Sequence, residues 1–165
     1  LHTVEEEDLD FLQRGVNDRR VWRPIGRPRP VTGPEEREFF EEVIVGGDGV
    51  HLLVCVEGER VGIVSLTDPD RSAEVGYWIA PESHEQGYGS AAVGRLVEYG
   101  FDQLGLHRVE ARVFDFNEAS QALLRSLGFT HEGTFRETGI VDGDYRDTLW
   151  FGLLEDEWRS GESSV

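Results

Sequence analysis

The stretch that decides the fold is GYWIAPESHEQGYGSA, residues 76–91 of a chain of 165 residues. Here a strand stops at Pro81, a short loop contains Gly87 and Gly89, and a long helix begins at Ser90. The N–H groups at the start of a helix are unpaired and carry a partial positive charge, and glycine lets a phosphate approach the backbone closely. This order indicates a phosphate-binding turn, although Gly-x-Gly alone is also typical of a tight strand-to-helix turn without a ligand.

The segments on either side of this turn are predicted as short helices and strands. Residues 22–34 contain four prolines and are expected to form an irregular loop. Asn117 is expected to cap the helix that it begins. The order of the elements predicts an α+β fold, in which a mixed, mostly antiparallel sheet has helices on both faces. The expected elements are helices at 4–15, 35–45, 90–104 and 117–127, and strands at 50–56, 60–66, 73–80, 107–114, 129–140 and 145–154.

The length and composition predict one globular domain, residues 1–158, followed by a short C-terminal tail at 159–165. The single cysteine, Cys55, excludes an internal disulfide and a multi-cysteine metal site, and the five histidines lack ligand spacing, so no metal is expected. The chain has no run of about 18 apolar residues, and residues 1–10 are acidic and lack the order of a signal peptide. We therefore expect a soluble, cytoplasmic protein that does not enter a membrane.

The charge of the chain is strongly acidic: 16 basic residues, all of them arginine, stand against 33 acidic residues and give a net charge of −17. Such a polyanion repels phosphate backbones, which disfavours binding to nucleic acid or to anionic membranes. One interpretation is an ordinary acidic protein. The other is adaptation to a cytoplasm of molar salt, where self-repulsion is screened and carboxylates keep the surface hydrated. The lack of lysine favours the second interpretation, because it resembles the proteins of halophiles that accumulate salt.

Further motifs follow residues 76–91 along the chain. They are RVEARV at 108–113, NEAS at 117–120, LGF at 127–129, RE at 136–137 and GDYRD at 143–147. The whole series resembles the GNAT superfamily of acyl-CoA-dependent N-acyltransferases, and the resemblance implies the GNAT fold. Within that superfamily the sequence is similar to the RimJ/RimL type, which acetylates the N-terminal amines of ribosomal proteins. The resemblance runs from about residue 3 to Trp158, which is most of the chain.

The resemblance implies that acetyl-CoA is bound as the acyl donor. The family's pyrophosphate loop, which is Arg or Gln, two residues, Gly, one residue, and Gly or Ala, falls on residues 84–89. His84 stands where Arg or Gln is usual, and Glu85 stands where Gly is common, so the Glu85 side chain is expected to point away from the phosphates. The strand end at 78–80 would pair its backbone with the pantetheine arm, and Asn117 would contact the same arm. The implied binding residues are Trp78, Ile79, Ala80, His84, Glu85, Gln86, Gly87, Tyr88, Gly89, Ser90 and Asn117.

Two residues are candidates for proton transfer. Many GNAT enzymes protonate the departing thiolate with a tyrosine, but the matching position here is Leu124. In the RimL-like branch the implied acid is the serine of the Asn-x-x-Ser helix start, which is Ser120; the alternative is a capping role alone. The branch's catalytic glutamate matches Gly139, and Glu137, two residues earlier, is expected on the same strand face and is the candidate base. A solvated surface carboxylate is the alternative for Glu137.

These observations predict a GNAT N-acetyltransferase that moves the acetyl group from acetyl-CoA directly to a primary amine. The favoured acceptor is the α-amine of a protein, ribosomal proteins included, because an α-amino group titrates near 7.7–8.0, against about 10.4 for lysine, and needs only a modest base. A small amine such as a polyamine stays open, as does a non-catalytic acyl-CoA-binding protein, which the missing tyrosine and Gly139 favour. A homodimer is compatible with the sequence. The proline-rich segment with Trp22 and Arg23 corresponds to the acceptor side of the family, where we expect specificity to reside.

Overall fold

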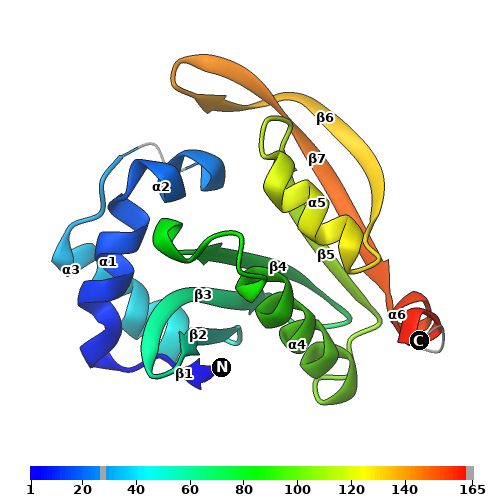
Figure 1. Cartoon of the computed structure of the whole chain (residues 1–165), viewed down its shortest axis with the longest axis horizontal. Helices are drawn as coiled ribbons and strands as arrows, with labels where there is room; N and C mark the ends of the chain where they lie inside the picture. The colour runs from blue at the N-terminus through cyan, green and yellow to red at the C-terminus, as the bar shows by residue number, and fades with distance from the viewer. Residues whose placement is uncertain (27–28, 163–165) are drawn as a thin grey trace.

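The computed structural model describes residues 1–26 and 29–162 and contains one mixed sheet of seven strands (Figure 1). The strand order is β1-β2-β3-β4-β5-β7-β6, and each neighbouring pair is antiparallel except β4 with β5. The predicted α+β fold is therefore confirmed. The strands are β1 (His2–Thr3), β2 (Val50–Val56), β3 (Glu59–Thr67), β4 (Ser72–Ile79), β5 (Arg108–Phe114), β6 (Thr130–Val141) and β7 (Asp144–Leu154).

Four α-helices follow the predicted order, whereas α2 and α6 were not predicted, and short turns lie between the helices. The α-helices are α1 (Leu9–Asn17), α2 (Arg19–Ile25), α3 (Gly33–Phe39), α4 (Tyr88–Asp102), α5 (Glu118–Ser126) and α6 (Glu155–Glu162). The shorter elements are the 3-10 turns η1 (Glu6–Asp8) and η3 (Pro81–Ser83) and the π-helix η2 (Phe40–Val45).

Two hydrophobic clusters, one on each face of the sheet, hold these elements together. Successive strand residues alternate between them, so Leu53 packs beneath α1 and Val54 packs beneath α4. On α4, the buried residues Val93, Leu96 and Val97 recur at helical spacing and face the sheet, as their sequence positions predict. We call the two sides the α4 face, covered by α4 and α5, and the α1 face, covered by α1, α2 and α3.

β4 and β5 separate part of the way along the sheet, and this separation positions the site. The two strands pair only where Ser72–Glu74 lies beside Arg108–Glu110. Beyond that point β4 stays with β3 as far as Ile79, while β5 stays with β7 as far as Phe114. α4 follows β4 and α5 follows β5, so the N-terminal ends of both helices lie near the gap (Figure 1).

The prediction of an irregular loop over residues 22–34 is wrong for its first part, because α2 continues to Ile25 and includes Pro24. The Asp18 side chain caps this helix, and Gly26 ends it in the left-handed conformation with a φ of 75°. A proline removes one backbone donor, which is a small loss in a helix of two turns with a strong start and stop. Residues 27–28 of the expected loop lie outside the described residues.

Two predicted boundaries differ from the structure for local reasons. The helix predicted at 35–45 begins earlier, since Thr32 and Glu35 form a capping box, and it changes from α3 into the π-helix η2 at Phe40. At the other end of the chain, α6 includes residues 159–162 of the predicted tail, and residues 163–165 lie outside the described residues.

Candidate active site

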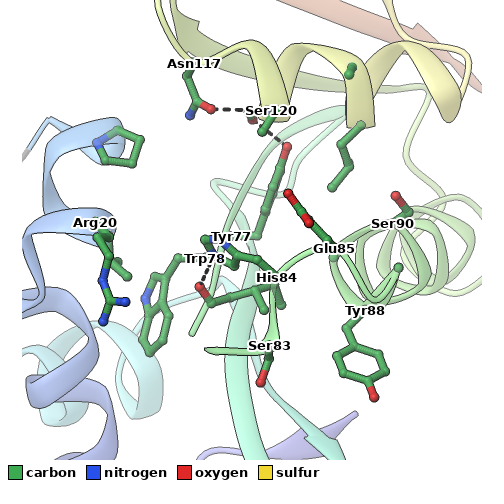
Figure 2. Close-up of a pocket in the computed structure, with 18 of the residues that line it drawn as sticks. Arg20, Tyr77, Trp78, Ser83, His84, Glu85, Tyr88, Ser90, Asn117 and Ser120 are labelled. Atoms are coloured by element: carbon green, nitrogen blue, oxygen red, sulfur yellow. Dashed lines mark hydrogen bonds between the residues drawn. The ribbon is translucent and has the colours of Figure 1, made fainter. Parts of the chain in front are cut away.

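A cleft of about 530 Å³ lies at the gap between β4 and β5 (Figure 2). Its walls come from the end of β4, the loop before α4, the first turns of α4 and α5, and α2. Of the predicted site residues, Ala80, Gln86 and Glu137 are not among the described residues that line it. The predicted residues that do line the cleft are Trp78, Ile79, His84, Glu85, Gly87, Tyr88, Gly89, Ser90, Asn117 and Ser120.

The start of α4 leaves its backbone N–H groups available to the cleft. Gly87 precedes the helix in the left-handed conformation, with a φ of 79°, and no side chain caps it, whereas side chains do cap α2, α3 and α5. A Cβ on Gly89 would lie 3.1 Å from Leu123 Cδ1, so glycine allows α4 and α5 to approach each other here. An uncapped helix start with its partial positive charge is a suitable site for a diphosphate.

Glu85 departs from the family pattern, and the backbone explains why glycine is common at this position. Its φ is 60°, in the left-handed region that residues with a Cβ adopt at a cost. The side chain lines the cleft, and Figure 2 shows it on the cleft side of the loop. A carboxylate there repels a diphosphate, so it has to rotate outward when an anionic ligand occupies the helix start.

The backbone of β4 presents hydrogen-bonding groups to the gap. Ala80 N–H donates to the carbonyl of Val61 on β3 over 2.7 Å, and such bonds alternate along an antiparallel strand. The N–H and C=O groups of Tyr77 and Ile79 therefore point away from β3, toward the cleft. Both groups of Trp78 and the N–H of Ala80 point toward β3, whereas the Ala80 carbonyl accepts a hydrogen bond of 2.8 Å from the Ser83 N–H. Of the three residues at 78–80, Ile79 is thus the one whose backbone is directed at a bound arm.

His84 occupies part of this edge in the ligand-free structure. Its Nε2 atom donates a hydrogen bond of 2.8 Å to the Ile79 carbonyl (Figure 2). An amide of a bound arm would compete with the imidazole for that carbonyl, whereas the Ile79 N–H is directed at the cleft and suits a substrate carbonyl. His84 therefore lies at the predicted site but contacts the strand edge.

Two hydroxyl groups meet in the cleft from opposite sides of the gap. Ser120 Oγ, at the start of α5, lies 2.6 Å from the Tyr77 hydroxyl of β4 (Figure 2). The Ser120 N–H donates to Asn117 Oδ1 over 3.2 Å, which confirms the predicted cap. Burial raises the pKa of Tyr77 to about 12, although its hydrogen bond with Ser120 opposes that shift. The phenol therefore keeps its proton at neutral pH.

Tyr77 is not among the predicted site residues, although it lies within residues 76–91. Strand alternation assigns its side chain to a face, but nothing in the sequence indicates that Ser120, 43 positions away, lies opposite. Leu124, at the position of the family's tyrosine, is fully buried in the cluster beneath α4. The tyrosine hydroxyl that protonates the thiolate in many GNAT enzymes therefore has no counterpart at position 124.

The expectation that Glu137 shares a strand face with Gly139 is wrong, because a bulge interrupts β6. The register changes from Phe135 opposite Thr148 to Gly139 opposite Arg146, so the β6 segment is two residues longer than its partner. Glu137 lies inside this bulge and is exposed, with a φ of 54°. Residues two positions apart in a strand share a face only where no bulge lies between them.

Position 139 itself cannot carry the branch's glutamate in this chain. A Cβ placed on Gly139 would overlap the ring of Phe114 at the end of β5. The backbone N–H of Glu137 donates to Asp147 Oδ1 over 2.9 Å, which stabilises the bulge. Neither position thus directs a carboxylate into the cleft.

A second cavity, of about 270 Å³, adjoins the cleft on the α1 face. The two cavities share Ile25, Tyr77 and Trp78 as walls. Two buried ionisable side chains, Glu36 and His51, line the second cavity. Burial lowers the pKa of His51, so its imidazole is neutral at pH 7. Because it reaches the same aromatic side chains as the cleft, this cavity is a candidate site for an acceptor.

Neither a metal site nor a membrane span is found in the described part of the chain. Within residues 1–26 and 29–162, no three His, Cys, Asp or Glu side chains are grouped so that they could hold a metal ion. In the same residues, no helix has the length and apolar character needed to cross a bilayer.

The gap between β4 and β5, the uncapped start of α4 and the Ile79 N–H directed at the cleft have the geometry that suits an extended phosphate-bearing cofactor. Residues 1–130 match the model of the acetyltransferase (GNAT) domain. The chain therefore belongs to the GNAT acetyltransferase family, as the resemblance implied. It is an acetyl-CoA-dependent N-acetyltransferase.

Several characterised and uncharacterised proteins resemble the chain over most of its length. It is 36% identical over 137 residues to "Putative ribosomal N-acetyltransferase YdaF" of Bacillus subtilis, covering 76% of this chain and 75% of that protein. It is 26% identical over 161 residues to spermidine N(1)-acetyltransferase of Escherichia coli K12, covering 96% and 87%. The crystal structure of spermidine N-acetyltransferase from Vibrio cholerae with CoA and spermine has the same fold, with a TM-score of 0.90 over 96% of both chains at 24% identity.

Proposed function

We propose that this enzyme acetylates the N-terminal α-amine of a protein. The observation that carries the proposal is the composition of the cleft, where Glu85 is the one carboxylate and His84 the one imidazole among the described lining residues. An α-amine is partly neutral at pH 7 and needs no strong base, unlike an alkyl amine of pKa about 10.4. The similarity to YdaF, whose name refers to a ribosomal acetyltransferase, supports the same acceptor.

In this scheme the acetyl-CoA diphosphate lies on the start of α4, at residues 87–90, and the pantetheine arm lies along the edge of Ile79. The Ile79 N–H faces the thioester carbonyl and stabilises the negative charge that develops on its oxygen as the amine attacks. Both substrates are bound at once, so proximity promotes direct transfer without a covalent enzyme intermediate.

We assign the protonation of the departing thiolate to Ser120. Its hydroxyl lines the cleft, and Asn117 anchors its backbone at the start of α5. Glu137 has no part in this scheme, because it lies in the bulge of β6 and is not among the described residues that line the cleft. The proton of the amine then leaves through solvent or a neighbouring hydroxyl.

A small cationic amine is the second candidate acceptor. The cavity of about 270 Å³ behind Tyr77 and Trp78 favours it, since this volume suits a short chain. The similarity to a spermidine acetyltransferase of E. coli points the same way.

A free-thiol release assay in molar KCl distinguishes the acceptors. Each peptide of a panel is compared with the same peptide blocked at its N-terminus, and spermidine is tested at equal concentration. We expect the free peptides to release thiol and the blocked ones to be inactive. Faster release with spermidine than with every peptide would refute the proposed acceptor.

The cofactor site has its own test in Gly89→Val. The branched side chain would contact Leu123 and Ile79 at the start of α4. At 100 times its dissociation constant acetyl-CoA stabilises a protein by about 2.7 kcal/mol, which raises the melting temperature. We expect Gly89→Val to lose this rise and Gly94→Ala, on the same helix, to keep it. A normal rise in Gly89→Val would place the diphosphate elsewhere.

A further inference from the structure

The hydrogen bond between Tyr77 and Ser120 bridges the gap at which acyl transfer takes place. The two hydroxyl oxygens are 2.6 Å apart, at the short end for such a pair. The Tyr77 ring packs against the cluster beneath α4, so its hydroxyl is held in place. The Ser120 backbone is anchored in turn by Asn117. Both hydroxyl groups are therefore held in place by contacts other than their bond to each other.

The direction of this hydrogen bond determines what Ser120 can do. When Tyr77 donates, Ser120 Oγ is the acceptor, and the serine proton is free to point into the cleft. A serine hydroxyl alone is a poor acid, because losing its proton leaves an alkoxide. A phenol that returns a proton in the same step removes that difficulty.

We propose that Tyr77 supplies, through Ser120, the proton that the departing thiolate takes up. The proposal rests on the proposed role of Ser120 but not on the identity of the acceptor. In this arrangement a phenol reaches the leaving group from β4, whereas the position of the family's tyrosine on α5 holds the buried Leu124. Tyr77 is a positioning residue, since it acts through Ser120.

The two proton transfers accompany the breaking of the C–S bond. As the C–S bond breaks, its electron pair goes to sulfur, and the Ser120 hydroxyl proton forms the S–H bond. The Tyr77 hydroxyl proton moves to Ser120 Oγ at the same time. The resulting phenolate recovers a proton from the ammonium formed on the acceptor nitrogen, directly or through water. The net change transfers one proton from the amine to the thiol.

Another tyrosine in the cleft lining does not offer the same path. Tyr88 also lines the cleft, but Figure 2 shows its ring directed away from the pair formed by Tyr77 and Ser120. Of the two tyrosines, Tyr77 is therefore the one whose hydroxyl can serve the relay, and removing that hydroxyl should slow the transfer.

The test is single-turnover kinetics on Tyr77→Phe, Ser120→Ala and the double variant, using whichever amine the wild-type enzyme acetylates fastest. Tyr99→Phe removes a phenol hydroxyl from the outer part of α4, where Tyr99 is 41% exposed, and is the matched control. We expect each single variant to lower the transfer rate by about 10²-fold or more. The acetyl-CoA dissociation constant should stay within about twofold, and the double variant should be no slower than the slower single one.

A proton inventory in mixtures of H₂O and D₂O provides a readout that a packing role would not change. The wild-type rate should depend on more than one transferred proton, and the Tyr77→Phe rate on one. A transfer rate in Tyr77→Phe within threefold of wild type would refute the relay, as would losses that multiply in the double variant. If spermidine proves the better acceptor, the proposed α-amine fails while this test still decides the role of Tyr77.

Discussion

The two faces of the sheet are covered by helices of different length and bury their side chains to different degrees. On the α4 face, α4 has 15 residues and α5 has 9, whereas α1, α2 and α3 on the other face have 9, 7 and 7 residues. Among the large, fully buried side chains of the described residues, Leu12 is the one that belongs to the α1 face. The α4 face is thus packed around one long helix, whereas the α1 face is assembled from shorter helices.

The largest loss of stability should come from creating a cavity in the hydrophobic cluster on each face. Leu96→Ala on α4 should lower the free energy of unfolding by about 4 kcal/mol, and Leu12→Ala on α1 by about 2–3 kcal/mol, because the smaller cluster can collapse around the cavity. Urea unfolding at fixed salt measures both values. An equal or larger loss for Leu12→Ala would show that the faces are equally well packed.

Overpacking should also distinguish the faces. A Cβ on Gly15 would overlap the Trp78 ring, so Gly15→Val should cost about 1–3 kcal/mol of stability. Gly94→Ala on α4 meets Leu127 Cδ2 at an ordinary 3.5 Å and should add up to about 1 kcal/mol through helix propensity. Thermal unfolding of the two variants checks the signs. A stable Gly15→Val variant would mean that Trp78 moves freely on the α1 face.

Removing salt should destabilise the helices of the α1 face before those of the α4 face. The range 33–45 carries five glutamates and one arginine, whereas α4 has two acidic residues and one arginine over a longer span. At 0.01 M salt the Debye length reaches about 30 Å, against about 3 Å at 1 M, so repulsion among these carboxylates grows as KCl is removed. Amide exchange in α3 should therefore accelerate before exchange in α4. Uniform protection from 0.01 M to 1 M KCl would argue against the halophile interpretation.

The smallest expected effect is an acid-dependent loosening of α2. The hydrogen bonds of Asp18 to the side chain and backbone N–H of Arg20 lower the pKa of Asp18 to about 2. A folded pKa below the unfolded value of about 3.9 gives stability that is present above pH 4 and is lost as the pH falls toward 2. Asp18→Asn keeps a capping side chain, so its α2 amides should lose this pH step. The step should be missing from α5, whose cap Asn117 is uncharged. Amide exchange as a function of pH measures both helices.

Much of the α4 face was predictable because its information is local. Val93, Leu96 and Val97 recur within two turns of one helix, and Gly87 and Gly89 mark the turn before it. The cap at Asn117 depends on a backbone group three residues away. Ten of the predicted site residues consequently line one cleft.

Two predictions were wrong, those for the loop at 22–34 and for the strand face of Glu137. In the first a local signal was outweighed by its neighbours, and in the second the cause lies in a distant strand. Four prolines in residues 22–34 favour a loop, yet Asp18 and Gly26, on either side of Pro24, are sufficient for a short helix. The bulge around Glu137 depends on how β6 pairs with β7, where Asp147 accepts the Glu137 N–H. No count along one strand reveals a register shift against another.

The sequence by itself determined the α+β class of the fold, because helical periodicity, glycine turns and helix caps each depend on residues close together in the chain. The family followed from the resemblance of its motifs. The tertiary structure alone decided which distant residues meet in the cleft. Tyr77 and Ser120 come within hydrogen-bonding distance since β4 and β5 part after Glu74, and that separation results from each strand keeping a different partner across the sheet. Contacts between distant segments depend on the packing of the whole sheet, so a local sequence pattern does not predict them.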